Sequence, residues 1–288
     1  MTYGIDVVGS EIRWVALSEQ ETSSQESYQG CGCVSISGEP NPLKIKQAIA
    51  GLFKRNKIRK FVVPVWGNKV RAKVFASDKV DISELEDNVA WEARFMLDYN
   101  SASELLSFDP LRRAEKQTWL ACAVAPLDTI KQYLSYFPSA PACVDTALTA
   151  LANAVTRSRY NQKDVMALHL DANRAFLVVV NPNNPALMQE IPNIKENPGR
   201  LNATSLSFWQ EELKLRLNLL TQEHRRIELF LLSGELALAP ENAVNLGEKL
   251  GVQGEVLDIM TDSGIKCSKE QSPLYTLAYA SALRGEVL

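Results

Sequence analysis

Histidine is nearly absent from this 288-residue sequence, which contains only His169 and His224. A metal site built from several histidines is therefore excluded, and few candidates remain for a Cys/His or Ser/His/Asp catalytic unit. Cysteine occurs five times at irregular spacing. An odd number without a regular pattern is typical of reduced thiols in a reducing compartment, not of a disulfide framework.

Long apolar runs are also missing. No run reaches the roughly 18 residues needed to span a bilayer. The opening MTYGIDVVGS lacks the charged and apolar regions of a signal peptide and is typical of a strand and a turn. We therefore expect a cytoplasmic protein without direct membrane insertion, for which any membrane attachment comes through a partner.

Neither sign of charge dominates, because 34 acidic and 31 basic residues give a formal net charge of −3. Such a balance produces no overall field that would recruit nucleic acid or anionic lipid, so we expect no nucleic-acid partner. One local basic cluster contains Lys54, Arg55, Lys57, Arg59 and Lys60. We interpret this cluster as the solvated end of a helix.

The order of the expected elements repeats within the chain. Residues 3–8 and 12–17 predict two strands joined by a tight turn, because apolar and polar residues alternate there. Residues 165–170 and 175–180 predict a second pair of this kind, and each pair is followed by helix and strand patterns. The repeat predicts two lobes with a cleft between them.

A segment of different pattern separates the two copies. We expect the apolar strand 61–65 to form a hairpin with 70–75, followed by a helix whose apolar residues lie on one face. Strands at 104–108 and 118–124 and a helix that ends at Pro138 complete this unit.

The pattern as a whole predicts three parts. Residues 1–60 and 139–164 form the first lobe, residues 61–138 form a small inserted α+β unit, and residues 165–288 form the second lobe. The expected fold class is α/β.

Four segments of this sequence together resemble one fold family. Gly4–Arg13 is similar to a phosphate-binding hairpin, and Leu106–Asp109 to a strand of an inserted 1C subdomain. Leu231–Gly234 is similar to an adenosine loop, and Tyr279–Gly285 to a closing helix. The family is the actin/Hsp70-like ATPases, and within it the PilM family of type IV pilus biogenesis proteins, relatives of the division protein FtsA. The resemblance covers nearly the whole chain and implies an actin/Hsp70-like two-lobe fold with a 1C-type subdomain.

The resemblance also implies a nucleotide site, with ATP and Mg²⁺ held between two hairpin loops. Asp6 would hold the metal through water, and Ser10 and Arg13 would line the phosphates. Gly9 would let the backbone approach the phosphates, and Gly234 would receive the adenosine.

The sequence departs from the family pattern in each nucleotide loop. Val8 occupies the usual glycine position of the first loop, Asp171 that of the second, and Glu235 that of the second adenosine-loop glycine. An acidic side chain at a phosphate site repels phosphate. We therefore expect a pseudo-ATPase with no catalytic residue, no cofactor and no metal; the alternative is ATP with Mg²⁺. We interpret His169 as a core histidine and not as a general base.

For partners, the resemblance implies the N-terminal tail of a PilN-like inner-membrane protein, bound between the first lobe and the inserted unit. Trp66 is the predicted exposed aromatic anchor for this tail, and packing within its own hairpin is the alternative interpretation. Pilus motor ATPases and further copies of the chain are other candidate partners.

The predicted function is an adaptor of a type IV pilus assembly platform, with an MSHA or competence pilus as the finer placement. An ATP-gated switch of the same machinery is one alternative. An adaptor of the FtsA or secretion-platform kind is another, although residues 282–288 lack the membrane-binding amphipathic helix usual in FtsA.

Overall fold

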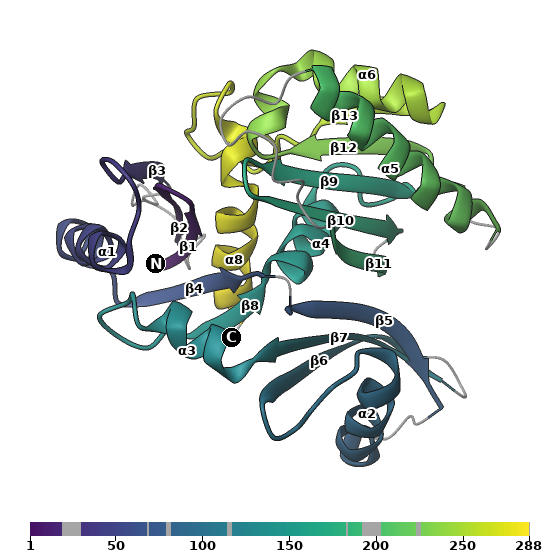
Figure 1. Ribbon diagram of the computed structural model, residues 1–288, viewed down its shortest axis with the longest axis horizontal. Coiled ribbons are helices and arrows are strands. Elements are labelled where there is room, and N and C mark those ends of the chain that lie inside the picture. The colour runs from purple at the N-terminus through teal and green to yellow at the C-terminus, as the bar shows by residue number, and fades with distance from the viewer. Residues whose placement is uncertain are drawn as a thin grey trace, which may run out of the picture.

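The structure, a computed structural model, describes residues 1–18, 30–67, 69–78, 82–113, 117–182, 184–191, 203–222 and 226–287. His224 lies outside these residues. Three β-sheets form the framework, and helices lie against their faces (Figure 1). Within the described residues, no helix combines the length and the apolar character that crossing a bilayer requires.

The first sheet contains the N-terminal strands. In pairing order they are β3 (Gly30–Ser35), β2 (Glu11–Leu17), β1 (Thr2–Val8), β4 (Lys60–Val65) and β8 (Cys143–Thr146). β1, β2 and β3 are antiparallel neighbours, whereas β4 and β8 run parallel to β1. Helix α1 (Pro42–Asn56) buries Leu52 and Phe53 against this sheet. The helix begins where the side chain of Asn41 accepts a hydrogen bond from the Lys44 N–H, at 3.0 Å.

The second sheet repeats this arrangement. In pairing order its strands are β11 (Asn184–Ile191), β10 (Arg174–Asn181), β9 (Val165–Asp171), β12 (Leu229–Ser233) and β13 (Gln253–Val256). Every residue of β9 and β12 is buried, as in sheets covered on both faces. Helices α5 (Ala203–Gln222) and α6 (Pro240–Leu250) cover one face, and α4 (Ala147–Arg157) covers the other.

The third sheet is the smallest. Its strands pair in the order β5 (Arg71–Ser77), β7 (Thr118–Pro126) and β6 (Glu104–Arg113). Helix α2 (Ile82–Met96) covers one face, where Val89 packs against Phe75 and Leu120. Helix α3 (Leu127–Leu134) follows β7 and leads back to the first sheet through β8.

The predicted hairpin between residues 61–65 and 70–75 is wrong. β4 pairs with β1 and β8 in the first sheet, whereas β5 pairs with β7 in the third. The physical reason is burial: β4 is buried from its second residue onward, which is typical of a central parallel strand with nonlocal neighbours. The first strand of the predicted inserted unit therefore belongs to the first sheet. The three-part division itself stays a prediction.

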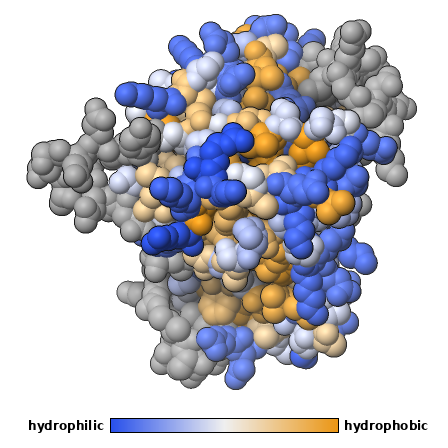
Figure 2. Space-filling view, turned by 90° about the vertical axis from the view of Figure 1, so that its left-hand side faces the viewer, coloured by the Kyte–Doolittle hydropathy of each residue, from blue (hydrophilic) through white to orange (hydrophobic). Residues whose placement is uncertain are grey.

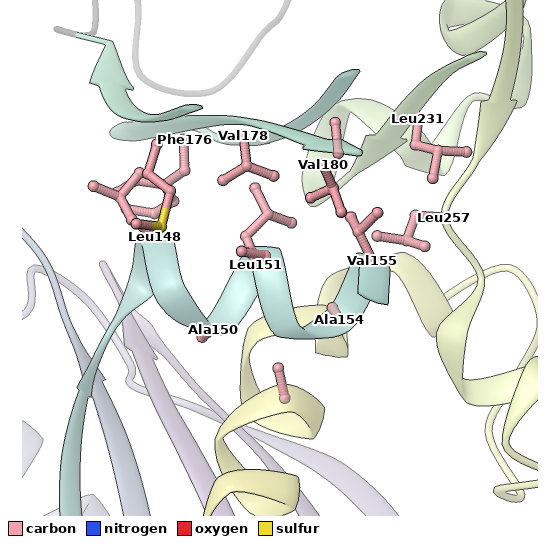
Figure 3. Packing of buried hydrophobic residues seen from close by; sticks show 14 of the residues in the cluster. Leu148, Ala150, Leu151, Ala154, Val155, Phe176, Val178, Val180, Leu231 and Leu257 are labelled. Atoms are coloured by element: carbon pink, nitrogen blue, oxygen red, sulfur yellow. The ribbon is translucent and has the colours of Figure 1, made fainter. Parts of the chain in front are cut away.

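Two helices lie between the first and second sheets. α4 packs against β10, and α8 (Thr276–Val287) packs against α4 on one side and against β1 and β4 on the other. In Figure 3, Leu151 and Val155 of α4 point toward the second sheet, whereas Ala150 and Ala154 face α8. The last helix of the chain thus rests on the first sheet, and the two sheets are joined through two layers of helix.

Contact between α8 and β1 depends on one glycine. A Cβ atom added to Gly4 would lie 1.7 Å from the carbonyl oxygen of Ala278 and 2.6 Å from the backbone nitrogen of Ala282. Both neighbours are helix backbone and cannot move independently of α8. A residue with a side chain would therefore force the helix away from the sheet.

We predict that Gly4→Ala lowers the free energy of unfolding by about 3 kcal/mol or more, because the added methyl group overlaps the backbone of α8. Gly51→Ala is the matched control, since nothing lies within 4 Å of that position in α1. It should raise stability by about 0.5–1 kcal/mol. Urea unfolding measures both. A Gly4→Ala midpoint equal to that of the wild type would contradict this packing of α8.

Candidate functional site

Two β-hairpins, β1–β2 and β9–β10, carry the same pair of charged residues. In the first hairpin Asp6 lies directly opposite Arg13, and in the second Asp171 lies directly opposite Arg174. All four side chains are buried, with at most 1% exposed. A buried charge requires a partner, and here each arginine finds one on the other hairpin.

Arg174 makes the main link between the hairpins. Its two terminal nitrogens donate to the two carboxylate oxygens of Asp6, at 2.7 and 2.5 Å. Its Nε donates to Oδ2 of Asp171 at 2.9 Å. The guanidinium group lies 5.4 Å from the ring centre of Trp66 and 5.7 Å from that of Phe176. Such a bidentate pair fixes orientation as well as distance.

Arg13 makes the reciprocal link. Its Nη1 donates to Oδ1 of Asp171 at 2.9 Å, and its Nη2 donates to Oε1 of Glu235 at 3.0 Å. Its Nε donates to Glu11 on the same hairpin at 3.0 Å. Glu235 opens the 3₁₀ helix η1 (Glu235–Leu238), which follows β12. Arg13 therefore connects the first hairpin to two separate elements around the second sheet.

Asp171 lies at the centre of these contacts. Besides both arginines, it meets Nε2 of His169 at 2.9 Å and accepts the backbone N–H of Glu235 at 3.2 Å. The other ring nitrogen of His169 lies 2.9 Å from the hydroxyl oxygen of Ser233. His169 is thus buried with a polar partner at each nitrogen, which confirms its interpretation as a core histidine. We refer to Asp6, Arg13, His169, Asp171, Arg174 and Glu235 as the charge network.

The network keeps Asp171 ionised. Burial alone would raise the pKa of Asp171, but the neighbouring His169, Arg174 and Arg13 hold it well below its usual range. Glu235 responds in the opposite way: burial, together with the charge of Asp171, raises its pKa. The two carboxyl groups therefore differ in proton affinity, although both contact Arg13.

The predicted metal-binding and phosphate-lining side chains have other partners in this structure. Both carboxylate oxygens of Asp6 accept hydrogen bonds from Arg174, and Arg13 is directed to Asp171 and Glu235. Within the described residues, no group of three or more His, Cys, Asp or Glu residues could hold a metal ion. The side chains expected to face Mg²⁺ and the phosphates therefore bind one another in this structure.

The predicted glycines and Ser10 lie around the network. Gly9 has a φ of +53° in the β1–β2 turn, and an added Cβ would lie 4.0 Å from the side-chain nitrogen of Asn173 in the other turn. Ser10 is exposed beside it. Gly234 has a φ of +81°, and an added Cβ would lie 2.6 Å from the backbone oxygen of Leu170. The structure brings these residues together but does not test nucleotide contact.

Trp66 follows β4 and is half-buried. Its ring covers Arg174 and packs against the core around α4, and its Nε1 is buried without a hydrogen-bond partner in the structure. Because β4 forms no hairpin with β5, the alternative of packing within that hairpin is wrong. Its role as an anchor for a partner stays a prediction.

Arg174 is the residue of the network that the sequence analysis missed. Its signal was present: each hairpin has an aspartate near the end of its first strand and an arginine near the start of its second. A charged residue within an otherwise apolar strand is rarely buried alone. Two such arginines in corresponding positions would have indicated a buried pairing.

Comparison with known proteins gives a match of structure only. No protein-family model matches the sequence, and no curated protein sequence matches it. The structure is similar to a chain of a "PilM-PilN type IV pilus biogenesis complex", with a TM-score of 0.79, 16% identity, and coverage of 99% of this chain and 98% of that chain.

Two other solved structures match less closely. A Bacteroides thetaiotaomicron protein with an actin-like ATPase fold and unknown function has a TM-score of 0.52 at 10% identity and covers 95% of each chain. The ethanolamine utilization protein EutJ from Carboxydothermus hydrogenoformans has a TM-score of 0.53 at 9% identity, over 98% of this chain and 89% of that chain. The predicted actin-like α/β fold is confirmed.

We predict that Arg174→Met lowers the free energy of unfolding by about 3–5 kcal/mol, because it leaves Asp6 buried without its counterion. Arg284→Met is the control: Arg284 pairs with Asp109 at a half-exposed position, where loss of an ion pair costs about 0–1 kcal/mol. Urea unfolding at neutral pH measures both variants. Equal losses would contradict a buried network.

The lowered pKa of Asp171 predicts a dependence on acid. A carboxyl group whose pKa is lower in the folded state stabilises that state above its unfolded pKa, about 3.9. This stabilisation is lost as pH falls through the folded value. The free energy of unfolding of the wild type should therefore decrease as the pH is lowered below about 5. It should decrease less steeply with pH in Asp171→Asn, although this variant is less stable than the wild type at neutral pH. The exposed control variant Asp87→Asn should keep the wild-type slope, and a wild-type slope in Asp171→Asn would contradict the assignment.

Proposed function

We propose that this chain is a PilM-like cytoplasmic adaptor of a type IV pilus assembly platform. The observation that carries this proposal is the end-to-end similarity to the chain from the PilM-PilN complex. It includes nearly all of both chains and is closer than the similarity to the other actin-like structures described above. A shared fold at low identity does not transfer a partner, so the proposal depends on a binding test.

The partner that we propose is the N-terminal tail of a PilN-like inner-membrane protein. β8 is an edge strand of the first sheet and β6 is an edge strand of the third. An edge strand offers unpaired backbone groups to an extended peptide. These two edges belong to the parts of the chain between which the family resemblance places the tail. Binding there would recruit the protein to the inner face of the membrane.

We further propose that the protein works without nucleotide, as a pseudo-ATPase. In the charge network, Arg174 neutralises Asp6, and the carboxylates of Asp171 and Glu235 lie beside the two hairpins where phosphates would have to enter. A phosphate group there would meet negative charge and would have to displace buried ion pairs. The retained turns at Gly9 and Gly234 favour the alternative of an ATP-gated switch, which a nucleotide titration distinguishes.

The expected result is saturable binding of a synthetic peptide that copies the first residues of a PilN-like protein from the same organism. Isothermal titration calorimetry of the full chain measures the binding, and a scrambled peptide of the same composition is the control. An extended peptide that adds to a sheet edge relies on backbone hydrogen bonds and side-chain pockets. The scrambled peptide should therefore bind much more weakly. Equal binding of the two peptides, or none, would reject the adaptor proposal.

Isothermal titration calorimetry also distinguishes the pseudo-ATPase adaptor from the ATP-gated switch. With Mg-ATP, ADP or a non-hydrolysable analogue, the proposal predicts no binding tighter than about 1 mM. Peptide binding without nucleotide binding supports the pseudo-ATPase adaptor. Saturable sub-millimolar nucleotide binding would replace it with the ATP-gated switch.

A further inference from the structure

The end of α1 and the turn into β4 form a strongly cationic region. Residues 42–60 contain seven of the 31 basic residues of the chain and none of its 34 acidic ones. The exposed members at the end of this segment are Lys54, Arg55, Lys57 and Arg59. We call these four residues the basic tip. In the described part of the chain, no acidic side chain forms an ion pair with any of them.

Among the described residues, the loop next to the basic tip supplies no neutralising charge. The loop 138–142 lies beside the start of β4, where Ala142 donates its N–H to the carbonyl oxygen of Phe61 at 2.8 Å. This loop, Pro-Ser-Ala-Pro-Ala, has no charged residue. Lys60 is only half-exposed and has a partner, so it is not counted in the tip. The positive charge of the tip is therefore directed to solvent.

The position of a cation at a helix end explains only two of the four residues of the basic tip. Lys54 and Arg55 lie in the last turn of α1, where a cation is favoured by the helix dipole. Lys57 and Arg59 lie beyond the helix. Lys57 has a φ of +51° and donates its N–H to the carbonyl oxygen of Phe53. Glycine adopts this left-handed conformation without penalty, whereas lysine does not. The chain therefore has a cation where local geometry favours glycine.

The position of the tip indicates the kind of partner. α1 lies at the edge of the molecule in Figure 1, and the view onto that side in Figure 2 shows hydrophilic side chains gathered at the height of this helix. The tip consists of a helix end and a turn, with long side chains that have no ion-pair partner in the described residues. Such a projecting group of cations suits a plane of anionic headgroups, because each cation can reach a negative charge without a shaped pocket.

We propose that the basic tip makes a peripheral electrostatic contact with an anionic lipid bilayer. The contact requires no insertion and does not depend on the proposed pilus function. Each lysine or arginine close to an anionic surface raises membrane partitioning about fivefold. Four such residues alone give weak binding, which becomes effective when a membrane-anchored partner already holds the protein nearby.

Vesicle co-sedimentation of the full chain tests the proposal, with vesicles of 30 mol% phosphatidylglycerol in phosphatidylcholine compared with pure phosphatidylcholine. The wild type should partition onto the anionic vesicles only, and partitioning should fall as salt is raised, because the contact is electrostatic. The variant Lys54→Gln/Arg55→Gln/Lys57→Gln/Arg59→Gln should lose about 600-fold in partitioning, the product of four fivefold effects. Thermal unfolding verifies that this variant is folded, and Lys54→Glu/Arg55→Glu provides a second variant with fewer changes.

The matched control replaces four exposed lysines elsewhere on the chain and keeps the same change in net charge. It is Lys163→Gln/Lys249→Gln/Lys266→Gln/Lys269→Gln, and it should bind like the wild type. Equal losses in both quadruple variants would overturn the proposal, because net charge alone would then explain binding. Absence of wild-type binding to anionic vesicles would also overturn it. If polyglutamate then bound through the tip, an acidic protein segment would be its partner instead.

Discussion

The rest of the structure depends on the bidentate ion pair between Arg174 and Asp6. This ion pair joins the β1–β2 hairpin to the β9–β10 hairpin. Each hairpin supplies a counterion for the other, because Arg13 reaches back to Asp171. Removing either arginine would leave a carboxylate buried without compensation, which is costly. The relation between the two sheets is therefore held by side chains of the protein itself. In a nucleotide-gated protein of this architecture, we would expect the ligand between the hairpins to have that role.

The rest of the fold supports this arrangement. α4 and α8 lie between the first and second sheets, and Gly4 lets α8 approach the backbone of β1. The edge strands of the first and third sheets stay free of partners within the sheets that the structure describes. An edge strand without a neighbouring strand can pair with an extended segment of another chain. These edges are where we propose that the partner peptide binds.

The hairpins could be predicted from the sequence, because two short strand patterns separated by a tight turn, at 3–17 and again at 165–180, are a local signal. The partner of β4 could not, since a buried parallel strand pairs with segments distant in sequence. The same limit applies to the site. The sequence suggests Asp6 as a ligand contact, but it cannot show that Asp6 pairs with Arg174, 168 positions away. Such a contact appears only when the two hairpins are placed side by side.

The most direct test is a crystal structure of the chain from crystals grown with saturating Mg²⁺ and a non-hydrolysable ATP analogue. It shows whether protein side chains occupy the position between the hairpins where a nucleotide would bind. We predict that the guanidinium group of Arg174 stays on both carboxylate oxygens of Asp6, with no nucleotide between the hairpins. A nucleotide bound there, with Asp6 released from Arg174 and directed to a hydrated Mg²⁺, would contradict it.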